Sequence, residues 1–91
     1  MASFKIEWKR SALKELKKLL APAIKNIVAK IELLAENLYL EGTKKLTGSH
    51  STYRIREGVY RVIYHVLSET ITIEIVKVGH RKDGYRKPNI Y

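Results

Sequence analysis

The sequence contains no cysteine. Disulfide bonds and thiolate metal sites are therefore excluded, and the three histidines, His50, His65 and His80, are too scattered along the chain to form a recognisable ligand set. We expect no structural metal and no cofactor.

Long apolar runs are also missing. No stretch approaches the roughly 18 consecutive apolar residues of a membrane span. The first nine residues lack the apolar core, about 7 to 15 residues long, that a secretory signal requires. We therefore expect no membrane-spanning segment and a cytoplasmic location.

Acidic residues are few. Eighteen Lys and Arg against nine Asp and Glu give a net charge of +9, and such an excess of one sign repels itself in the folded state. The excess is uneven, with a net +3 in residues 1–43 and +6 in residues 44–91. We expect an anionic partner, which could be nucleic acid, an anionic membrane or an acidic protein, and a functional surface mainly in the second half.

The first half of the chain predicts one strand and two helices. Apolar and charged residues alternate over residues 4–8, as in a half-buried strand. Leucine and isoleucine then recur at helical spacing, which predicts an antiparallel helical hairpin over residues 11 to about 40. We expect Ser11 to cap the first helix, Pro22 to lie in the first turn of the second and Gly42 to end it.

The second half changes to a period of two. After an expected loop at residues 41–51, three β-rich runs predict a three-stranded antiparallel meander, at residues 53–56, 60–67 and 70–78. We expect residues 79–91 to be a loop with a loose end. Residues 1–91 then make a single α+β domain in which the helices cover one face of the sheet and leave the other free for a ligand.

Three arginines are expected on one face of this meander. If the first two strands of the meander form a hairpin with a two-residue turn within residues 57–59, strand alternation puts Arg54, Arg56 and Arg61 on the same face. Like charges opposite one another destabilise a hairpin by up to about 1 kcal/mol, and nothing nearby in the sequence compensates. The arrangement predicts a bound anion, and the alternative is an ordinary solvated basic face.

The third strand is expected to bring further groups to the same edge. Pairing it through a turn at Ser68-Glu69 puts Val76 opposite Arg61 and runs the following segment beside the arginine hairpin. One edge of the sheet is then expected to gather Arg54, Arg56, Arg61, His80, Arg81 and Tyr85. Guanidinium groups bind phosphate and aromatic rings stack on unpaired bases, so this set predicts an RNA site that stabilises the charge developing at phosphorus during strand cleavage.

Three segments, in this order, resemble the RelE/ParE toxin superfamily. They are KLTG at residues 45–48, YRIREGVYRVIY at residues 53–64 and VGHRKDGY at residues 78–85. The arginine triplet and the VGHR segment look like the RelE-like branch of mRNA interferases. The resemblance implies the RelE-like fold and a toxin of a type II toxin–antitoxin system. Such a toxin is a ribosome-dependent endoribonuclease that cleaves mRNA in the A site by 2′-hydroxyl attack and so inhibits translation. An acidic antitoxin and the ribosome with its mRNA are the implied partners.

The resemblance also implies roles for single residues. Arg54 and Arg56 match the family's basic pair, Arg61 its phosphate-stabilising arginine, Arg81 its basic residue after the last strand and Tyr85 its C-terminal tyrosine. Several relatives carry lysines where Arg54 and Arg56 stand here. Nearby basic residues are expected to contact RNA as well, namely Lys44, Lys45, Lys82 and Arg86.

His80 is expected to transfer protons. A guanidinium group has a pKa above about 12 and cannot act as a base near neutral pH, whereas an imidazole ordinarily titrates near 6.5. The competing view is that positioning and fixed charge suffice. Two other functions also stay open: a ParE-like, non-enzymatic inhibitor of DNA gyrase, whose branch generally lacks this full cationic set, and a plain RNA- or ribosome-binding module.

Overall fold

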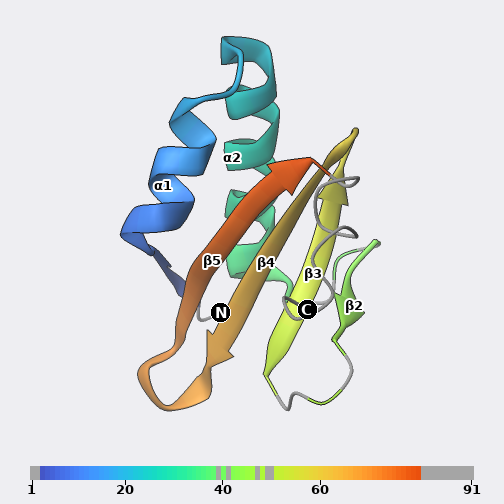
Figure 1. Cartoon of the computed structure of the whole chain (residues 1–91). Coiled ribbons are helices and arrows are strands. Elements are labelled where there is room, and N and C mark those ends of the chain that lie inside the picture. The colour runs from blue at the N-terminus through green and yellow to red at the C-terminus, as the bar shows by residue number, and fades with distance from the viewer. Residues whose placement is uncertain (1–2, 39, 41, 47, 49–50, 81–91) are drawn as a thin grey trace.

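The computed structural model of the protein describes residues 3–38, 40, 42–46, 48 and 51–80. In chain order the elements are β1 (Lys5–Trp8), α1 (Arg10–Lys17), α2 (Ala21–Glu36), β2 (Lys44–Lys45), β3 (Thr52–Glu57), β4 (Tyr60–Leu67), a single 3₁₀ turn (Ser68–Thr70) and β5 (Thr72–His80). The strands form a five-stranded sheet in the order β1-β5-β4-β3-β2, and both helices lie on one side of it (Figure 1). Neither helix is long and apolar enough to cross a membrane. The predicted α+β class, with the helices on one face, is confirmed.

The helical hairpin is present, but its ends differ from those predicted. The helix α1 begins at Arg10 after Lys9, which makes no side-chain capping hydrogen bond, so Ser11 is already inside the helix. Pro22 lies in the first turn of α2, as predicted. The second helix ends at Glu36 rather than near Gly42, because Asn37 turns to an extended conformation with φ −147°.

The predicted loop at residues 41–51 contains a short strand. Lys44 and Lys45 form β2, which pairs antiparallel with β3 by placing Lys44 opposite Arg54 and Lys45 opposite Tyr53. The amide of Leu46 continues the contact by donating to the carbonyl of Thr52 at 2.9 Å. A two-residue strand is too short to show a period of two, which is why the sequence pattern did not reveal it.

The hydrophobic core lies between the helices and one face of the sheet. Its buried members come from α1, α2, β3, β4 and β5 and are Ala12, Leu16, Ile27, Ile31, Leu34, Ile55, Val62, Tyr64, Ile73, Ile75 and Val78. Tyr64 is fully buried, stacks on Tyr53 with ring centroids 5.7 Å apart, and donates its hydroxyl to the carbonyl of Leu38 at 3.1 Å. Burying an aromatic ring of this size contributes about 2 to 3 kcal/mol, provided that its hydroxyl finds a partner, as it does here.

The β3–β4 hairpin has one of the two expected registers. Glu57 pairs with Tyr60, so the turn is Gly58-Val59, and Arg56 lies directly opposite Arg61. Gly58 has a φ of 62°, which its missing Cβ makes inexpensive, and this suits the first central position of a two-residue hairpin turn. The predicted shared face of Arg54, Arg56 and Arg61 follows from this register.

The β4–β5 register differs from the prediction. The connection is not a two-residue turn at Ser68-Glu69, since Leu67 pairs with Thr72 across a 3₁₀ turn closed by Ile71 at φ 50°. Farther along, Tyr64 pairs with Ile75 but Ile63 pairs with Lys77, so Val76 is an extra, bulged residue. Arg61 therefore lies opposite Gly79 and not opposite Val76. Gly79 and His80 belong to β5 rather than to a loop, and residues 81–91 lie outside the described residues.

Candidate functional site

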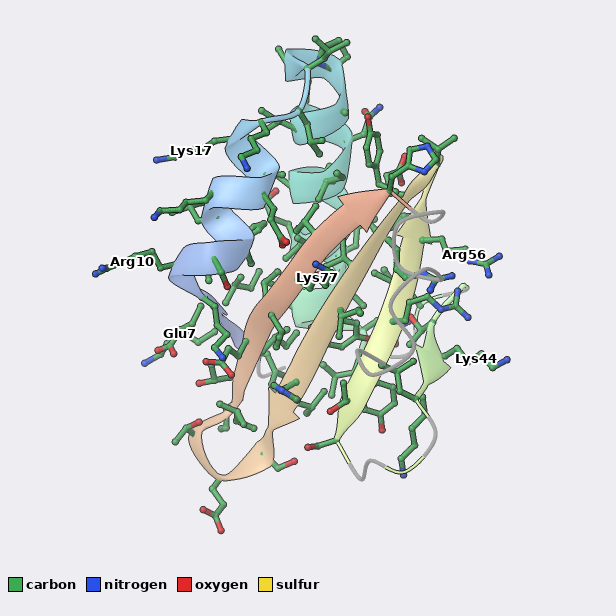
Figure 2. All side chains as sticks on the ribbon, in the orientation of Figure 1. Glu7, Arg10, Lys17, Lys44, Arg56 and Lys77 are labelled. Carbon is green, nitrogen blue, oxygen red and sulfur yellow. The ribbon has the colours of Figure 1, made fainter. Side chains whose placement is uncertain are left out.

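A cationic face is built on the side of the sheet that the helices leave open. On β2, β3 and β4, strand alternation places four Lys and Arg residues there: Lys44, Arg54, Arg56 and Arg61. Lys77 of β5 has the same parity, but its ammonium group is bound to Glu15 of α1. Cross-strand pairing sets Lys44 beside Arg54 and Arg56 beside Arg61. In Figure 2 the Lys44 and Arg56 side chains both project away from the side of the molecule that carries α1. We call these four residues the cationic face.

The guanidinium groups of the cationic face differ in depth. Arg56 is exposed, Arg54 is half-buried, and Arg61 is only 9% exposed. Each of the three also makes a further interaction within the chain. Burying a charged guanidinium group costs free energy unless the charge is paired. A side chain that is already held in place loses little conformational entropy when it binds an anion. Of the three guanidinium groups, that of Arg61 is therefore the most shielded from water.

Gly79 leaves room beside Arg61. It is the cross-strand partner of Arg61 on β5 and so lies on the same face, but it has no side chain. A Cβ placed on Gly79 would meet no described atom within 4 Å. The space over Arg61 is thus bordered by Arg56 on one strand and by bare backbone on the other.

His80 does not join the arginines. It pairs with Tyr60, and the two rings meet edge to face with centroids 6.0 Å apart. Tyr60 belongs to the helix-facing side, where it lines a pocket of about 270 Å³ together with Pro22, Ala23 and Asn26 of α2. Without the bulge at Val76, His80 would fall on the same side as Arg61, because a one-residue slip moves side chains to the other face. The structure therefore separates His80 from the cationic face on which it was expected.

The other predicted residues are distributed as follows. Lys44 joins the cationic face, whereas Lys45 is exposed and pairs with Tyr53 on the opposite parity. Four predicted residues lie outside the described residues, namely Arg81, Lys82, Tyr85 and Arg86. His65, which was given no role, is held by Thr52, whose Oγ1 lies 2.8 Å from the His65 Nδ1. Within the described ranges no three His, Asp or Glu side chains gather as a metal site would require.

One structural contact escaped the sequence analysis. The Glu15 carboxylate of α1 accepts hydrogen bonds from the Val78 amide at 2.9 Å and from the Lys77 ammonium at 3.0 Å. The strand β1 covers the outer edge of β5 only as far as Ile75, so Val78 needs an acceptor from elsewhere. Glu15 thereby fixes the end of β5 that carries Gly79 and His80. A single acidic residue in an otherwise basic helix was the available signal.

The cationic face can bind and polarise a phosphodiester. Arginine presents a planar fork of donors that matches phosphate oxygens, and several such groups in fixed positions favour a pentacovalent phosphorus with its extra negative charge. The described part of the face offers fixed charge, which suits positioning and electrostatic stabilisation of a transition state. It supplies no covalent nucleophile aimed at the space over Arg61.

Comparison with known proteins identifies the family. Residues 6–85 match the family of the ParE toxin of the type II toxin–antitoxin system parDE. A relative named RelE1, from Methanocaldococcus jannaschii, is 35% identical over 88 residues, which cover 93% of this chain and 98% of the relative. Solved structures agree with this match. The E. coli RelBE toxin–antitoxin complex aligns with a TM-score of 0.77 and 26% identity over 86% of this chain and 96% of its own. The RelB–RelE complex from Methanococcus jannaschii aligns with a TM-score of 0.72 and 31% identity over 87% and 94%.

The sequence segments, the five-stranded sheet with its helical hairpin, and these relatives agree with one another. The chain belongs to the RelE/ParE superfamily and is a toxin of a RelBE-type toxin–antitoxin system.

Proposed function

We propose that this toxin is an endoribonuclease that cleaves mRNA in the ribosomal A site. The observation that carries the proposal is the cationic face, in which Arg61 is recessed between Arg56 and the bare backbone of Gly79. A toxin that acted only by covering a protein target would gain little from arginines set opposite each other, because their repulsion destabilises the hairpin. A phosphodiester bound between them removes that repulsion.

The proposed reaction is an intramolecular transfer. The 2′-oxygen of one ribose attacks the adjacent phosphorus, the bond to the 5′-oxygen of the next nucleotide breaks, and a 2′,3′-cyclic phosphate remains. The proton lost by the 2′-hydroxyl is matched by one gained at the leaving 5′-oxygen. Arg54, Arg56 and Arg61 stabilise the charge on the phosphoryl oxygens while the ribosome holds the codon in line.

The positive charge of the toxin also indicates the kind of protein that inhibits it. An acidic antitoxin is the proposed inhibitor, because the free chain carries +9 and its solved relatives from E. coli and M. jannaschii are complexes of toxin with antitoxin. Covering Arg61 and Arg56 would abolish phosphate binding without any change in the fold. The antitoxin therefore needs acidic groups that reach the open side of the sheet.

Cleavage of programmed ribosomes tests the function. Wild-type toxin, added to ribosomes with an empty A site and labelled mRNA, should yield fragments that end in a 2′,3′-cyclic phosphate. Arg61→Ala should reduce the cleavage rate by at least about a hundredfold, as expected when a transition-state donor is lost. Retained folding is checked by circular dichroism, and antitoxin binding by calorimetry.

The same assay decides between the proposal and its rivals. An Arg61→Ala variant that folds and cleaves normally overturns the phosphate-centred mechanism. A wild-type toxin that leaves RNA intact but blocks DNA supercoiling by gyrase would assign it to the non-enzymatic function. Binding to ribosomes without cleavage would make it a plain ribosome-binding module.

A further inference from the structure

The outer face of α1 carries a continuous row of positive charge. Arg10, Lys14 and Lys17 are spaced by four and three residues, so they form one stripe about 10 Å long on the helix surface. All three are exposed, and Figure 2 shows Arg10 and Lys17 projecting outward from α1, away from the sheet. We call these three residues the α1 stripe.

The spacing of the α1 stripe and the position of Arg10 are unfavourable for the helix. Like charges three or four residues apart repel each other on a helix. Arg10 also occupies the first turn, where the helix dipole is positive and no acidic residue is present, and Lys9 at the N-cap makes no side-chain capping bond. Lys14 and Lys17 lie in the last turn, where the helix dipole favours positive charge. Helix stability therefore does not explain Arg10, nor the alignment of all three cations in one row.

No acidic side chain among the described residues forms an ion pair with the stripe. Glu15 is the one acidic residue of α1, and it faces β5, where it binds Lys77 and the Val78 amide. The ion pairs between described side chains are Lys30 with Glu57 and Lys77 with Glu15, and neither includes a member of the stripe. Within the described part of the chain, the charge of the stripe therefore faces solvent.

The α1 stripe and the cationic face point in different directions. The helices cover one side of the sheet and the arginines occupy the other, and in Figure 2 Arg10 and Lys17 extend to the opposite side of the molecule from Arg56 and Lys44. An RNA strand that lies over Arg61 on one side of the sheet contacts α1 on the other side only if it bends around the molecule. A partner that meets both surfaces must surround the protein.

The composition of the α1 surface favours nucleic acid over protein. Its exposed residues, Arg10, Ser11, Lys14 and Lys17, are all polar. Protein interfaces are anchored by buried aromatic or apolar side chains and are depleted in lysine, whereas a phosphate backbone is bound by cations alone. An anionic membrane would likewise require an apolar anchor for lasting attachment.

We propose that the α1 stripe is a second RNA-binding surface, which contacts the phosphate backbone of folded RNA while the cationic face holds the strand to be cut. The inference rests on the proposed function, because a folded RNA that encloses the substrate strand is what a ribosomal A site provides. The stripe then contributes to association with the ribosome rather than to the chemistry at phosphorus.

Binding to programmed ribosomes at several salt concentrations tests the stripe. The mRNA carries a 2′-O-methyl group at the attacking position, which prevents cleavage and leaves binding measurable. The variant Lys14→Gln/Lys17→Gln is compared with Lys5→Gln/Lys25→Gln, which removes two other exposed lysines, from β1 and α2. A third variant, Lys14→Arg/Lys17→Arg, keeps the charge, and thermal melts check that all three fold.

We expect the Lys14→Gln/Lys17→Gln variant to bind ribosomes at least about tenfold more weakly at 0.1 M salt, with a slope of log Kd against log salt that is lower by about two. The Lys5→Gln/Lys25→Gln control should change by less than about threefold, and the arginine variant should bind like wild type. Affinity for a twelve-nucleotide single-stranded RNA should fall much less than affinity for the ribosome.

Several results would overturn the inference. One is an equal loss in the stripe variant and the lysine control. Another is a loss confined to antitoxin binding, or to binding of phosphatidylglycerol vesicles, with ribosome binding intact. Cleavage of unmodified mRNA by the wild type is scored in parallel, so failure of the proposed function is recognised separately from failure of the stripe.

Discussion

Gly79 and Arg61 face each other across β5 and β4, and this pair sets how closely a phosphate can approach a recessed guanidinium. The variant Gly79→Ala adds a methyl group where no described atom lies within 4 Å, and the backbone there needs no positive φ. Stability should therefore change by less than about 1 kcal/mol, in either direction. Cleavage should fall about tenfold or more, because small displacements of a reacting group cost rate steeply.

Single-turnover cleavage and denaturant unfolding of Gly79→Ala check this expectation together. Normal stability with a reduced rate supports the assigned space above Arg61. An unchanged rate would mean that substrate does not occupy that space.

The structure changes the expectation for His80. Because its ring lies against Tyr60 on the helix-facing side, we predict that His80→Gln lowers single-turnover cleavage by less than about tenfold and leaves the pH profile between about pH 5.5 and 8 unchanged. General acid–base catalysis typically contributes a hundredfold or more. Tyr60→Leu, which removes the other ring of the pair, should have an equally small effect on chemistry. A hundredfold loss with an altered profile in His80→Gln alone would restore its proton-transfer role.

At the scale of the elements, two strands show which features could be predicted from the sequence. The shared face of Arg54, Arg56 and Arg61 required only a two-residue turn, because both candidate turns give the same parity. The position of His80 depended on the bulge at Val76, which alternation alone does not reveal. A trace of it is present, since the buried apolar positions of β5 change from odd (Ile73, Ile75) to even (Val78). Adjacent apolar residues within a strand can also mean burial on both faces, so the phase change is ambiguous without a register.

The contact between α1 and β5 is expected to stabilise the end of the strand that borders the cationic face. Glu15→Ala leaves the Val78 amide and the Lys77 ammonium without their acceptor. Both charged side chains are about one-third exposed, at 31% and 29%, so solvent screening limits the loss to about 1 kcal/mol. For a domain of this size that corresponds to a fall in Tm of about 4 to 8 °C.

Glu32→Ala is the matched control, since Glu32 is an exposed acidic residue in the other helix. Calorimetric melts of the two variants measure the difference. Equal melting temperatures would show that water replaces the Glu15 carboxylate at no cost.

At the scale of the whole molecule, repulsion between the positive charges destabilises the folded state. A net charge of +9 on 91 residues repels itself, and both the cationic face and the α1 stripe concentrate that repulsion. The ion pairs Lys30–Glu57 and Lys77–Glu15 oppose this repulsion weakly, because partly exposed pairs contribute only about 0 to 1 kcal/mol each. Repulsion should therefore dominate the response of the free toxin to ions.

We predict that the Tm of the free toxin rises by several degrees when sodium chloride increases from 0.05 to 0.5 M, because the Debye length falls below the spacing of the surface charges. A twelve-nucleotide RNA that carries a non-cleavable 2′-O-methyl backbone should raise the Tm further at low salt, since a ligand at a hundred times its Kd adds about 2.7 kcal/mol. The RNA increment should disappear at 0.5 M salt, where phosphate contacts weaken. If the Tm instead falls steadily with salt, attraction within ion pairs outweighs repulsion. The cationic surfaces then destabilise the fold less than their sequence indicates. Differential scanning calorimetry of the same sample across the salt series distinguishes the two outcomes.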